Sequence, residues 1–319
     1  MTTTLVTGGA GFIGSHLVEA LLDQGHHVIV YDDLSTGSIQ NLSEAQANPN
    51  LAIVLDSIAQ EESLLAQLER ADEIYHLAAV VGVRLVLEQP ERTAETNVGP
   101  TEIILRYLSR NPKPFFLAST SEVYGKSSKV PLSEEDDLIL GPPTISRWIY
   151  ACSKAMDEYL ALAHHQRTGL PVVVGRFFNV VGPRQIGRYG MVVPRFIQHA
   201  KTGGPLIVHD DGEQVRCFSH VQDVIGGMMA LMSTPAAYGK IFNLGNDQPT
   251  SIRGLAEMVI RVVNPQATLE HVSYQQAFGK SFEDIRCRIP DLTRIKQTID
   301  YQPEYDLEAI IRELASLES

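Results

Sequence analysis

A glycine-rich segment near the start of the chain places the strongest constraint on the fold. It reads Thr-Gly-Gly-Ala-Gly-Phe-Ile-Gly over residues 7–14, between the β-branched run Thr4–Thr7 and Phe12–Gln24, which has the apolar spacing of a helix. Glycines at this spacing allow a tight turn, let the backbone approach a pyrophosphate and pack the helix against its strand. The amino terminus of that helix offers N–H groups and a positive dipole end to phosphate oxygens. The segment therefore predicts the first strand–turn–helix unit of a dinucleotide-binding fold.

The first half of the chain continues to alternate strand-like and helix-like segments. This alternation predicts an α/β fold, a Rossmann-type doubly wound parallel sheet with helices on both faces. The further expected strands are His27–Tyr31, Leu51–Leu55, Glu73–Leu77, Pro114–Ala118 and Pro171–Gly175.

The alternation stops after Gly182, where the chain becomes rich in loops. We therefore expect a smaller C-terminal domain that is interleaved with the first. Residues 1–175 and about 215–245 would form the dinucleotide-binding domain, and about 176–214 and 246–319 a substrate domain.

The composition limits the classes of partner. The 319 residues carry a formal net charge of −12, which disfavours nucleic acid and anionic membrane surfaces. The three cysteines, at positions 152, 217 and 287, form no CxxC pair, and the ten histidines show no ligand spacing, so we expect no metal and a reducing compartment. No Lys or Arg precedes Arg70, and no apolar run has the length of a membrane span. We expect a cytoplasmic protein.

An acid after the second expected strand selects the form of the dinucleotide. Asp32 stands where a carboxylate accepts hydrogen bonds from the adenosine ribose and repels a 2′-phosphate. Because the first sixty-nine residues contain no Lys or Arg, we expect NAD rather than NADP. Asp56 and Ser57 follow the third strand and are expected beside the adenine, although they also suit an ordinary turn. The cofactor contacts expected in the glycine-rich segment are Gly8, Gly11, Phe12, Ile13 and Gly14.

Tyr150 and Lys154 form a Tyr-x-x-x-Lys motif in a segment that is expected to be helical as far as Leu160. Their i, i+4 spacing places both side chains on one helix face. An ammonium close to a phenol favours the phenolate, so Tyr150 is expected to act as a general base. Thr120, at the end of the strand before this helix, is expected to bind the hydroxyl that Tyr150 deprotonates, or else to cap the turn.

Together these motifs resemble the extended short-chain dehydrogenases, the NAD-dependent nucleotide-sugar epimerases and dehydratases. The resemblance covers nearly the whole chain and implies a bound NAD that oxidises the sugar at C4 and is regenerated in each turnover. It also implies a homodimer that forms through a four-helix bundle. Further motifs that carry it are His-Leu-Ala-Ala at 76–79, Asn97 and Ser-Thr-Ser-Glu-Val-Tyr-Gly at 119–125. The cofactor contacts that it implies are Leu77, Ala78, Ala79, Asn97, Tyr150 and Lys154.

The resemblance also implies a binding site for a nucleotide sugar, with UDP as the expected nucleotide. Asn179, Arg216 and Arg288 would contact its diphosphate. Guanidinium groups match phosphate oxygens in pairs, although an isolated Arg more often forms a structural ion pair. Phe178 and Val193 would flank the nucleobase.

Glu122 distinguishes the reactions of the superfamily. The 4,6-dehydratases carry Asp-Glu where this chain has Ser121-Glu122, and this order, with Arg-Trp-Ile-Tyr at 147–150, resembles the UDP-glucuronate decarboxylases. We expect decarboxylation of UDP-glucuronate through a 4-keto sugar. Glu122 would orient the sugar or assist at C5, and Arg288 or a residue of 184–188 would meet the carboxylate. The alternatives are a 4-epimerase of a UDP-hexose or UDP-uronic acid and, more remotely, a non-catalytic NAD-sensing scaffold.

Overall fold

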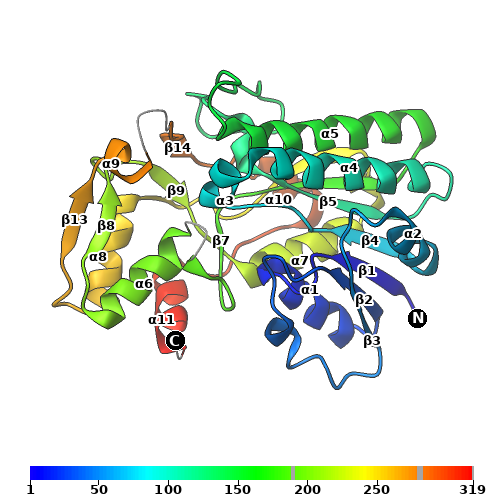
Figure 1. Cartoon of the computed structure of the whole chain (residues 1–319), viewed down its shortest axis with the longest axis horizontal. Helices are drawn as coiled ribbons and strands as arrows, with labels where there is room; N and C mark the ends of the chain where they lie inside the picture. The colour runs from blue at the N-terminus through cyan, green and yellow to red at the C-terminus, as the bar shows by residue number, and fades with distance from the viewer. Residues whose placement is uncertain (188–190, 279–282, 318–319) are drawn as a thin grey trace.

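A seven-stranded sheet forms the centre of the molecule (Figure 1). The computed structural model describes residues 1–187, 191–278 and 283–317. The strand order is β11-β6-β5-β4-β1-β2-β3, and every neighbouring pair is parallel. This order is that of a doubly wound sheet with its switch point between β1 and β4, so the predicted fold class is confirmed. The strands are β1 (Thr3–Thr7), β2 (His27–Asp32), β3 (Leu51–Leu55), β4 (Glu73–His76), β5 (Phe115–Thr120), β6 (Val172–Phe177) and β11 (Lys240–Leu244).

Two apolar clusters cover the two faces of this sheet. Because side chains alternate along a strand, the buried neighbours Leu5 and Val6 pack into opposite layers. The layer on Val6 contains α1 (Phe12–Asp23), α7 (Val221–Met232) and α10 (Thr293–Ile299). The layer on Leu5 contains α2 (Glu61–Arg70), α4 (Pro90–Leu108) and α5 (Trp148–Thr168).

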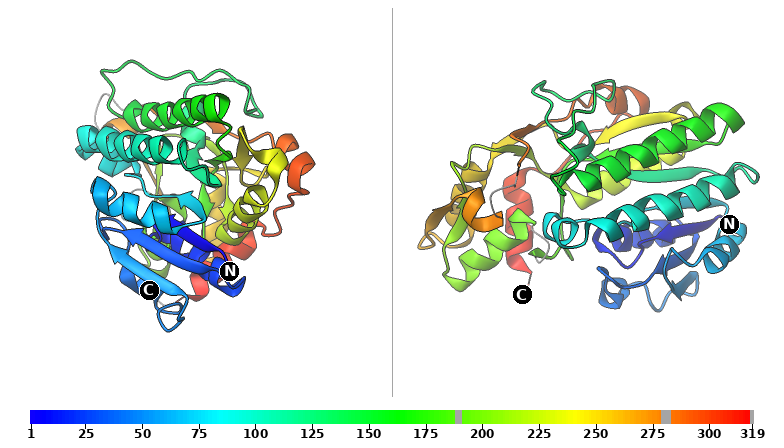
Figure 2. Two further views of the ribbon diagram at one scale, coloured as in Figure 1. Left: turned by 90° about the vertical axis from the view of Figure 1, so that its right-hand side faces the viewer. Right: turned by 45° about the horizontal axis from the view of Figure 1, so that its top comes forward.

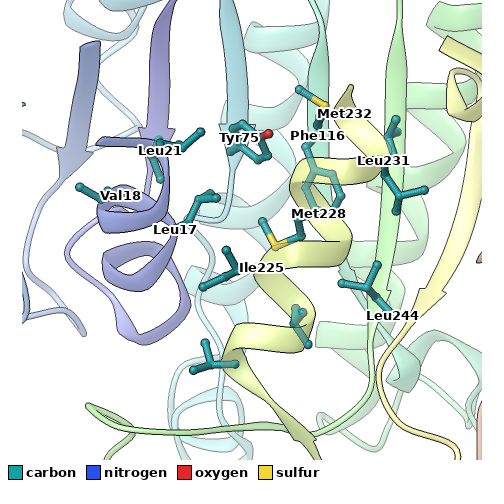
Figure 3. Close-up of a cluster of buried hydrophobic side chains, with 14 of the residues drawn as sticks. Leu17, Val18, Leu21, Tyr75, Phe116, Ile225, Met228, Leu231, Met232 and Leu244 are labelled. Carbon is teal, nitrogen blue, oxygen red and sulfur yellow. The ribbon is translucent and has the colours of Figure 1, made fainter. Parts of the chain in front are cut away.

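Helix α7 comes from the second half of the chain and returns to the sheet beside α1. Figure 3 shows Leu17 and Leu21 of α1 and Met228 of α7 around the rings of Tyr75 and Phe116. On the opposite layer, α4 and α5 lie side by side along the outside of the molecule (Figures 1 and 2). Helix α5 ends at Thr168. The next residue, Gly169, has a left-handed φ of 74° and donates its N–H to the His165 carbonyl oxygen, which forms a regular C-terminal cap.

A third apolar cluster lies at the other end of the molecule, away from β1–β3 (Figure 1). It is formed chiefly by α6, α8 and α11, with Phe196, Leu255 and Ile310 fully or almost fully buried. Strand β9 joins β12 and β14, and β14 carries Arg288 towards the main sheet. The remaining elements are α3 (Val83–Glu88), β7 (Val180–Val181), α6 (Val192–Thr202), β8 (Leu206–His209), β9 (Val215–Cys217), β10 (Ser219–His220), β12 (Pro249–Ser251), α8 (Ile252–Val263), β13 (Leu269–Val272), α9 (Tyr274–Phe278), β14 (Cys287–Arg288), α11 (Leu307–Ser316) and the 3-10 turns η1 (Ile39–Leu42), η2 (Ser121–Tyr124) and η4 (Pro235–Ala237).

Candidate active site

The glycine-rich turn between β1 and α1 lies against the end of β4. Gly8 has a φ of +72°, and a Cβ there would come within 2.8 Å of the Ala78 nitrogen. A Cβ at Gly14 would lie 2.1 Å from the Gly8 carbonyl oxygen. Gly11 differs, because within the described chain its Cβ would meet only that oxygen, at 3.1 Å. The fold therefore requires Gly8 and Gly14, whereas the open space at Gly11 suits a bound group.

Gly11 also caps helix α1, and Phe12 and Ile13 form its first turn. No side chain caps these N–H groups, and the first turn holds no acidic residue. Backbone N–H groups and the positive end of the helix dipole therefore face the space beside Gly11. The predicted pyrophosphate residues lie together and fit a dinucleotide.

Asp32 ends β2 next to this turn. Its buried carboxylate accepts hydrogen bonds from the backbone N–H of Ala10 at 2.9 Å and of Leu34 at 2.8 Å. Burial raises the pKa of Asp32, while these two donors oppose the rise. One bond to each oxygen leaves further lone pairs for the hydroxyls of a ribose.

The loop after Asp32 also belongs to this site, and the sequence motifs did not single it out. The Ser38 N–H donates to the Ala10 carbonyl oxygen at 3.0 Å, and a Cβ at Gly37 would come within 2.8 Å of that oxygen. The signal in the sequence was the glycine of Ser-Thr-Gly at 35–37, one residue after the acidic pair at 32–33.

Asp56 and Ser57 follow β3 at the same edge of the sheet. The Asp56 N–H donates to the Asp32 carbonyl oxygen at 3.1 Å, and the Asp56 carboxylate accepts from the Ser57 N–H at 2.8 Å. The Tyr31 hydroxyl donates to the Ser57 carbonyl oxygen at 3.1 Å. These contacts place the pair beside Asp32, and they also serve the turn itself.

The segment after β4, residues 77–79, is joined to α4 and α5 through Asn97. The Asn97 side chain accepts from the Val80 N–H at 2.8 Å and donates to the Ser153 hydroxyl at 3.1 Å. Ser153 directly precedes Lys154. Asn97 therefore fixes the position of Leu77, Ala78 and Ala79 relative to α5.

His76 lies beneath this segment and is fully buried. Its ring nitrogens contact the hydroxyls of Thr7 at 2.7 Å and Thr101 at 3.1 Å. Because the Thr101 hydroxyl donates to the Asn97 carbonyl at 2.8 Å, Nε2 of His76 must donate and Nδ1 must accept. Burial, and then the Lys154 charge, lower the pKa of His76 to about 3, so its ring is neutral.

Tyr150 and Lys154 lie one turn apart in the first half of α5. Burial raises the pKa of Tyr150 well above its usual range, and Glu122 raises it further. The hydrogen bond with Thr120 and the charge of Arg288 lower it. Lys154 is not an isolated charge as the motif suggested, because its Nζ lies 2.8 Å from the Asp157 carboxylate. The sequence-based description of the base omitted this counter-ion and needs that correction.

Thr120 ends β5 and points towards the same edge of the sheet. Its hydroxyl accepts from the Glu122 N–H at 3.2 Å and so caps η2. The hydroxyl also bonds with Tyr150. The expected turn cap is therefore present, and the bond to Tyr150 places the Thr120 hydroxyl next to the expected base.

Arg288 contacts the residues that directly follow β5. Its Nη1 lies 3.5 Å from a Glu122 oxygen and 3.4 Å from the Ser121 hydroxyl. Burial, and then repulsion by Arg216, lower the pKa of Arg288 to about 10, which still leaves it charged at neutral pH. Arg147 approaches the other Glu122 oxygen at 3.6 Å.

A second carboxylate, Asp284, links the arginines. It lies 3.3 Å from Arg147 and 3.1 Å from Arg216, and it accepts from the Tyr274 hydroxyl. Burial favours a higher pKa for Asp284, but Arg216 and Arg147 lower it below its usual range. Three guanidiniums and two carboxylates, those of Glu122 and Asp284, give this cluster a formal charge of 3 − 2 = +1. An anionic ligand would balance that charge.

The remaining expected substrate residues lie deeper in the protein. Asn179 has a φ of +35°, and its side chain donates to the Cys217 carbonyl at 2.8 Å, which ties β7 to β9. The Val193 side chain is fully buried in the third cluster, and Phe178 is fully buried against Tyr124. The expectation that these two side chains flank a nucleobase is wrong, because apolar packing encloses both.

The family model described as GDP-mannose 4,6 dehydratase matches residues 5–314. The chain belongs to this family. The match agrees with the resemblance to nucleotide-sugar epimerases and dehydratases that the motifs indicated.

Two curated relatives and one solved structure are similar to nearly the whole of this chain. The chain is 37% identical to a UDP-N-acetyl-alpha-D-glucosaminuronate decarboxylase of Bacillus cytotoxicus over 97% of its length and 95% of that protein. It is 35% identical to UDP-glucuronic acid decarboxylase 1 of Arabidopsis thaliana, over 95% of its length and 66% of the plant protein. A solved structure of UDP-glucuronic acid 4-epimerase from Bacillus cereus, in complex with UDP-glucuronic acid and NAD, matches with a TM-score of 0.87 and 27% identity, and covers 98% of each chain.

The described residues also bear on two other classes of site. None of these residues forms a group of three or more His, Cys, Asp or Glu side chains that would hold a metal. No helix among them has both the length and the apolar character to cross a membrane.

The site that results contains residues from both halves of the chain. The sequence motifs indicated Thr120, Glu122, Tyr150 and Lys154, and the structure brings them to one edge of the sheet. The motifs missed Asp157, Asp284 and the role of Arg147, which lies three residues before Tyr150 and has no motif spacing to Asp284. Only the fold brings position 284 to position 147.

Proposed function

We propose that this chain decarboxylates a UDP-linked hexuronic acid through a 4-keto intermediate, with UDP-glucuronate as the first substrate to test. The observation that carries the proposal is the position of Arg288. Its guanidinium contacts Ser121 and Glu122, and its charge lowers the pKa of Tyr150. A cation there would pair with a carboxylate at C6 of a sugar whose C4 hydroxyl meets Tyr150. The named activities of the bacterial and plant relatives support the same reaction.

We further propose NAD as the resident cofactor. The open space at Gly11, the uncapped start of α1 and the carboxylate of Asp32 fit its pyrophosphate and adenosine ribose. When bound, oxidised NAD accepts a hydride from the sugar and later returns it. Phe12 and Ile13 begin α1, and the Leu77 N–H donates to the Thr7 carbonyl oxygen at 3.1 Å, so both segments adjoin the glycine-rich turn that would hold the cofactor.

The chain's own residues account for the proton transfers. Tyr150 takes the proton of the C4 hydroxyl, which Thr120 orients, as the C4–H bond is lost as hydride. The C4 ketone makes the C6 carboxylate a β-keto acid. The C5–C6 bond then breaks, carbon dioxide leaves, and the electron pair remains as a C4 enolate. C5 then takes a proton from solvent, the hydride returns to C4, and Tyr150 gives its proton back to the C4 oxygen, which yields a UDP-pentose. Glu122 would orient the sugar or assist at C5, and Arg288 would hold the carboxylate until it leaves as carbon dioxide.

A 4-epimerase of a UDP-hexuronic acid is the second candidate. The structural relative from Bacillus cereus carries that name, and the pairing of Arg288 with a carboxylate would serve either reaction. In the epimerase the C5–C6 bond stays intact, so the mass of the product distinguishes the two.

The test is mass spectrometry of UDP-glucuronate and UDP-N-acetylglucosaminuronate after incubation with the protein and NAD, with separation of isomers. We expect a product lighter by one carbon dioxide. A new isomer of unchanged mass would instead establish the epimerase, and no product from either uronic acid would refute both candidates.

Two variants assign the roles within this assay. We expect Arg288→Lys to lower kcat/KM for the uronic acid about 100-fold, because a point charge does not replace a paired guanidinium, with NAD binding unchanged. Arg261→Lys is the matched control, since Arg261 lies on the exposed side of α8 and pairs with Glu308. Decarboxylation by Glu122→Gln at the full rate would show that Glu122 takes no part.

The arrangement of domains and subunits is also a proposal. The separate third cluster supports a substrate domain of about 176–214 and 246–319, next to a cofactor domain of 1–175 and about 215–245. Met156 and Tyr159 are 47% and 66% exposed on the outer side of α5, which supports a homodimer through α4 and α5. The molar mass in solution tests the dimer.

The cellular location is a separate proposal. The free cysteines, with Cys217 buried, support a cytoplasmic location.

A further inference from the structure

Asp157 is a buried carboxylate beside the catalytic lysine that the reaction above does not use. Its Oδ2 lies 2.8 Å from Nζ of Lys154, and the two side chains are 0% and 3% exposed. Its other oxygen is buried and makes no regular hydrogen bond among the described residues, although the Thr101 hydroxyl of α4 lowers the pKa of this carboxyl. Burying a carboxylate with one close ion pair and only a weak second partner is costly, so packing alone does not account for an acid at this position.

The neighbouring acid, Glu158, shows what a structural ion pair in the same helix looks like. Both of its oxygens are bonded by Arg176 of β6, at 2.7 to 3.2 Å, and the Ser119 hydroxyl of β5 also donates to it. Glu158 therefore joins α5 to two strands of the sheet. Asp157 instead pairs within its own helix, with the residue that lies next to the base.

The helix places Asp157 on the same face as the base. Tyr150, Lys154 and Asp157 stand at positions i, i+4 and i+7 of α5. Seven residues of helix span about 10 Å, with the ammonium of Lys154 between the two oxygen-bearing side chains. The negative charge of Asp157 thus offsets the effect of the Lys154 ammonium on the phenol of Tyr150.

We propose that Asp157 is a positioning residue that holds the Lys154 ammonium and offsets its charge beside Tyr150. The inference rests on the proposed role of Tyr150 as the base. Because the paired charges nearly cancel, Lys154 alone does not make Tyr150 a base. Deprotonation then depends on the additional positive charge of an oxidised nicotinamide, which couples activation of the base to the redox state of the cofactor.

The other charged groups around the pair are already balanced or neutral. His76 of β4 is neutral, and Glu158 is neutralised by Arg176. Glu122 raises the pKa of Tyr150, and Arg288 lowers it. Neutralising position 157 therefore changes the net charge near the phenol by one unit.

The test is a titration of the Tyr150 phenol by NMR, in the NAD-bound protein with tyrosine labelled at the ζ carbon. The signal of Tyr150 is assigned from its loss in Tyr150→Phe. We expect Asp157→Asn to lower the pH of the Tyr150 transition by about one unit, from one charge at about 10 Å and an effective dielectric constant near 20. Glu102→Gln removes the same charge from an exposed position on α4 and should leave the transition unchanged.

Asp157→Glu, which keeps the charge, should restore a transition close to that of the wild type. An Asp157→Asn transition at the wild-type pH, with only a loss of thermal stability, would show that Asp157 is merely structural. If Asp157→Asn does not fold, Asp157→Ser provides the same comparison with a smaller neutral side chain. No substrate is present in this titration, so its result stands whether or not the protein decarboxylates a uronic acid.

Discussion

Gly11→Ala and Gly14→Ala separate what the glycine-rich turn does for the fold from what it does for the cofactor. A Cβ at Gly14 would lie 2.1 Å from the Gly8 oxygen and 2.8 Å from the Gly9 Cα, both of them backbone atoms of the turn itself. Relief requires movement of the turn, so we expect Gly14→Ala to lose about 3 kcal/mol of unfolding free energy or more. Gly11 has a φ of −76°, which alanine adopts freely, and its Cβ would make a single 3.1 Å contact. We expect Gly11→Ala to lose less than about 1 kcal/mol.

For NAD affinity, in contrast to stability, we expect a large effect of Gly11→Ala. The Gly11 methyl group would fill the space in which the backbone meets the pyrophosphate, so we expect NAD to bind about 100-fold more weakly, a loss of about 2.7 kcal/mol. At NAD equal to about 1,000 times the wild-type Kd, the cofactor stabilises the wild type by about 4.1 kcal/mol and this variant by about 1.4 kcal/mol. Urea denaturation with and without NAD measures both quantities.

Gly226→Ala is the matched control, because Gly226 lies on the exposed side of α7 with no heavy atom within 4 Å of a built Cβ. It should be neutral or slightly stabilising and should bind NAD normally. Wild-type NAD affinity in a folded Gly11→Ala protein would falsify the assignment of this turn to the pyrophosphate.

Two further predictions concern buried charge. Glu158→Gln leaves the buried Arg176 guanidinium without its bidentate partner, so we expect a loss of about 3–5 kcal/mol of unfolding free energy in urea denaturation. Glu61→Gln, in an exposed pair with Arg106, should change the unfolding free energy by less than about 0.5 kcal/mol. Similar losses in both variants would refute this reasoning. His76 has a folded pKa of about 3 against 6.5 in the unfolded chain, so only the unfolded state gains its proton as the pH falls from about 6.5 to 3, and stability is lost over that range by up to about 1.4 kcal/mol per pH unit. In His76→Gln this part of the pH dependence should disappear, and an unchanged slope of unfolding free energy against pH would contradict the burial of a neutral ring.

The sequence predicted the sheet and the cofactor end of the site because both depend on local pattern. The order of strand, glycine turn and helix at residues 3–23 fixes where Gly11 and Asp32 meet, since neighbouring parallel strands bring their carboxyl ends to one edge. Tyr150 and Lys154 were found because an i, i+4 spacing determines a shared helix face.

The sequence misplaced or missed residues wherever packing decides. Val193 and Phe178 have the apolar character of a base-binding wall, but apolar residues also fill cores, and here both are enclosed. Asp157 stands in the sequence beside Glu158, and nothing in the local pattern shows that one acid faces Lys154 while the other binds Arg176 of β6.

The sequence by itself thus determined the class of fold and the strand–helix rhythm, and it predicted the base, since these follow from spacings of a few residues. Only the tertiary structure decided the charge balance around that base. Arg147, Arg216, Arg288 and Asp284 lie up to 141 positions apart in the chain, 288 − 147. They become neighbours because β14 pairs with β9, which carries Arg216, and the segment before β14 brings Asp284 against Arg147. Electrostatic energy depends on distance in space, which spacing along a chain does not report beyond a single helix or turn.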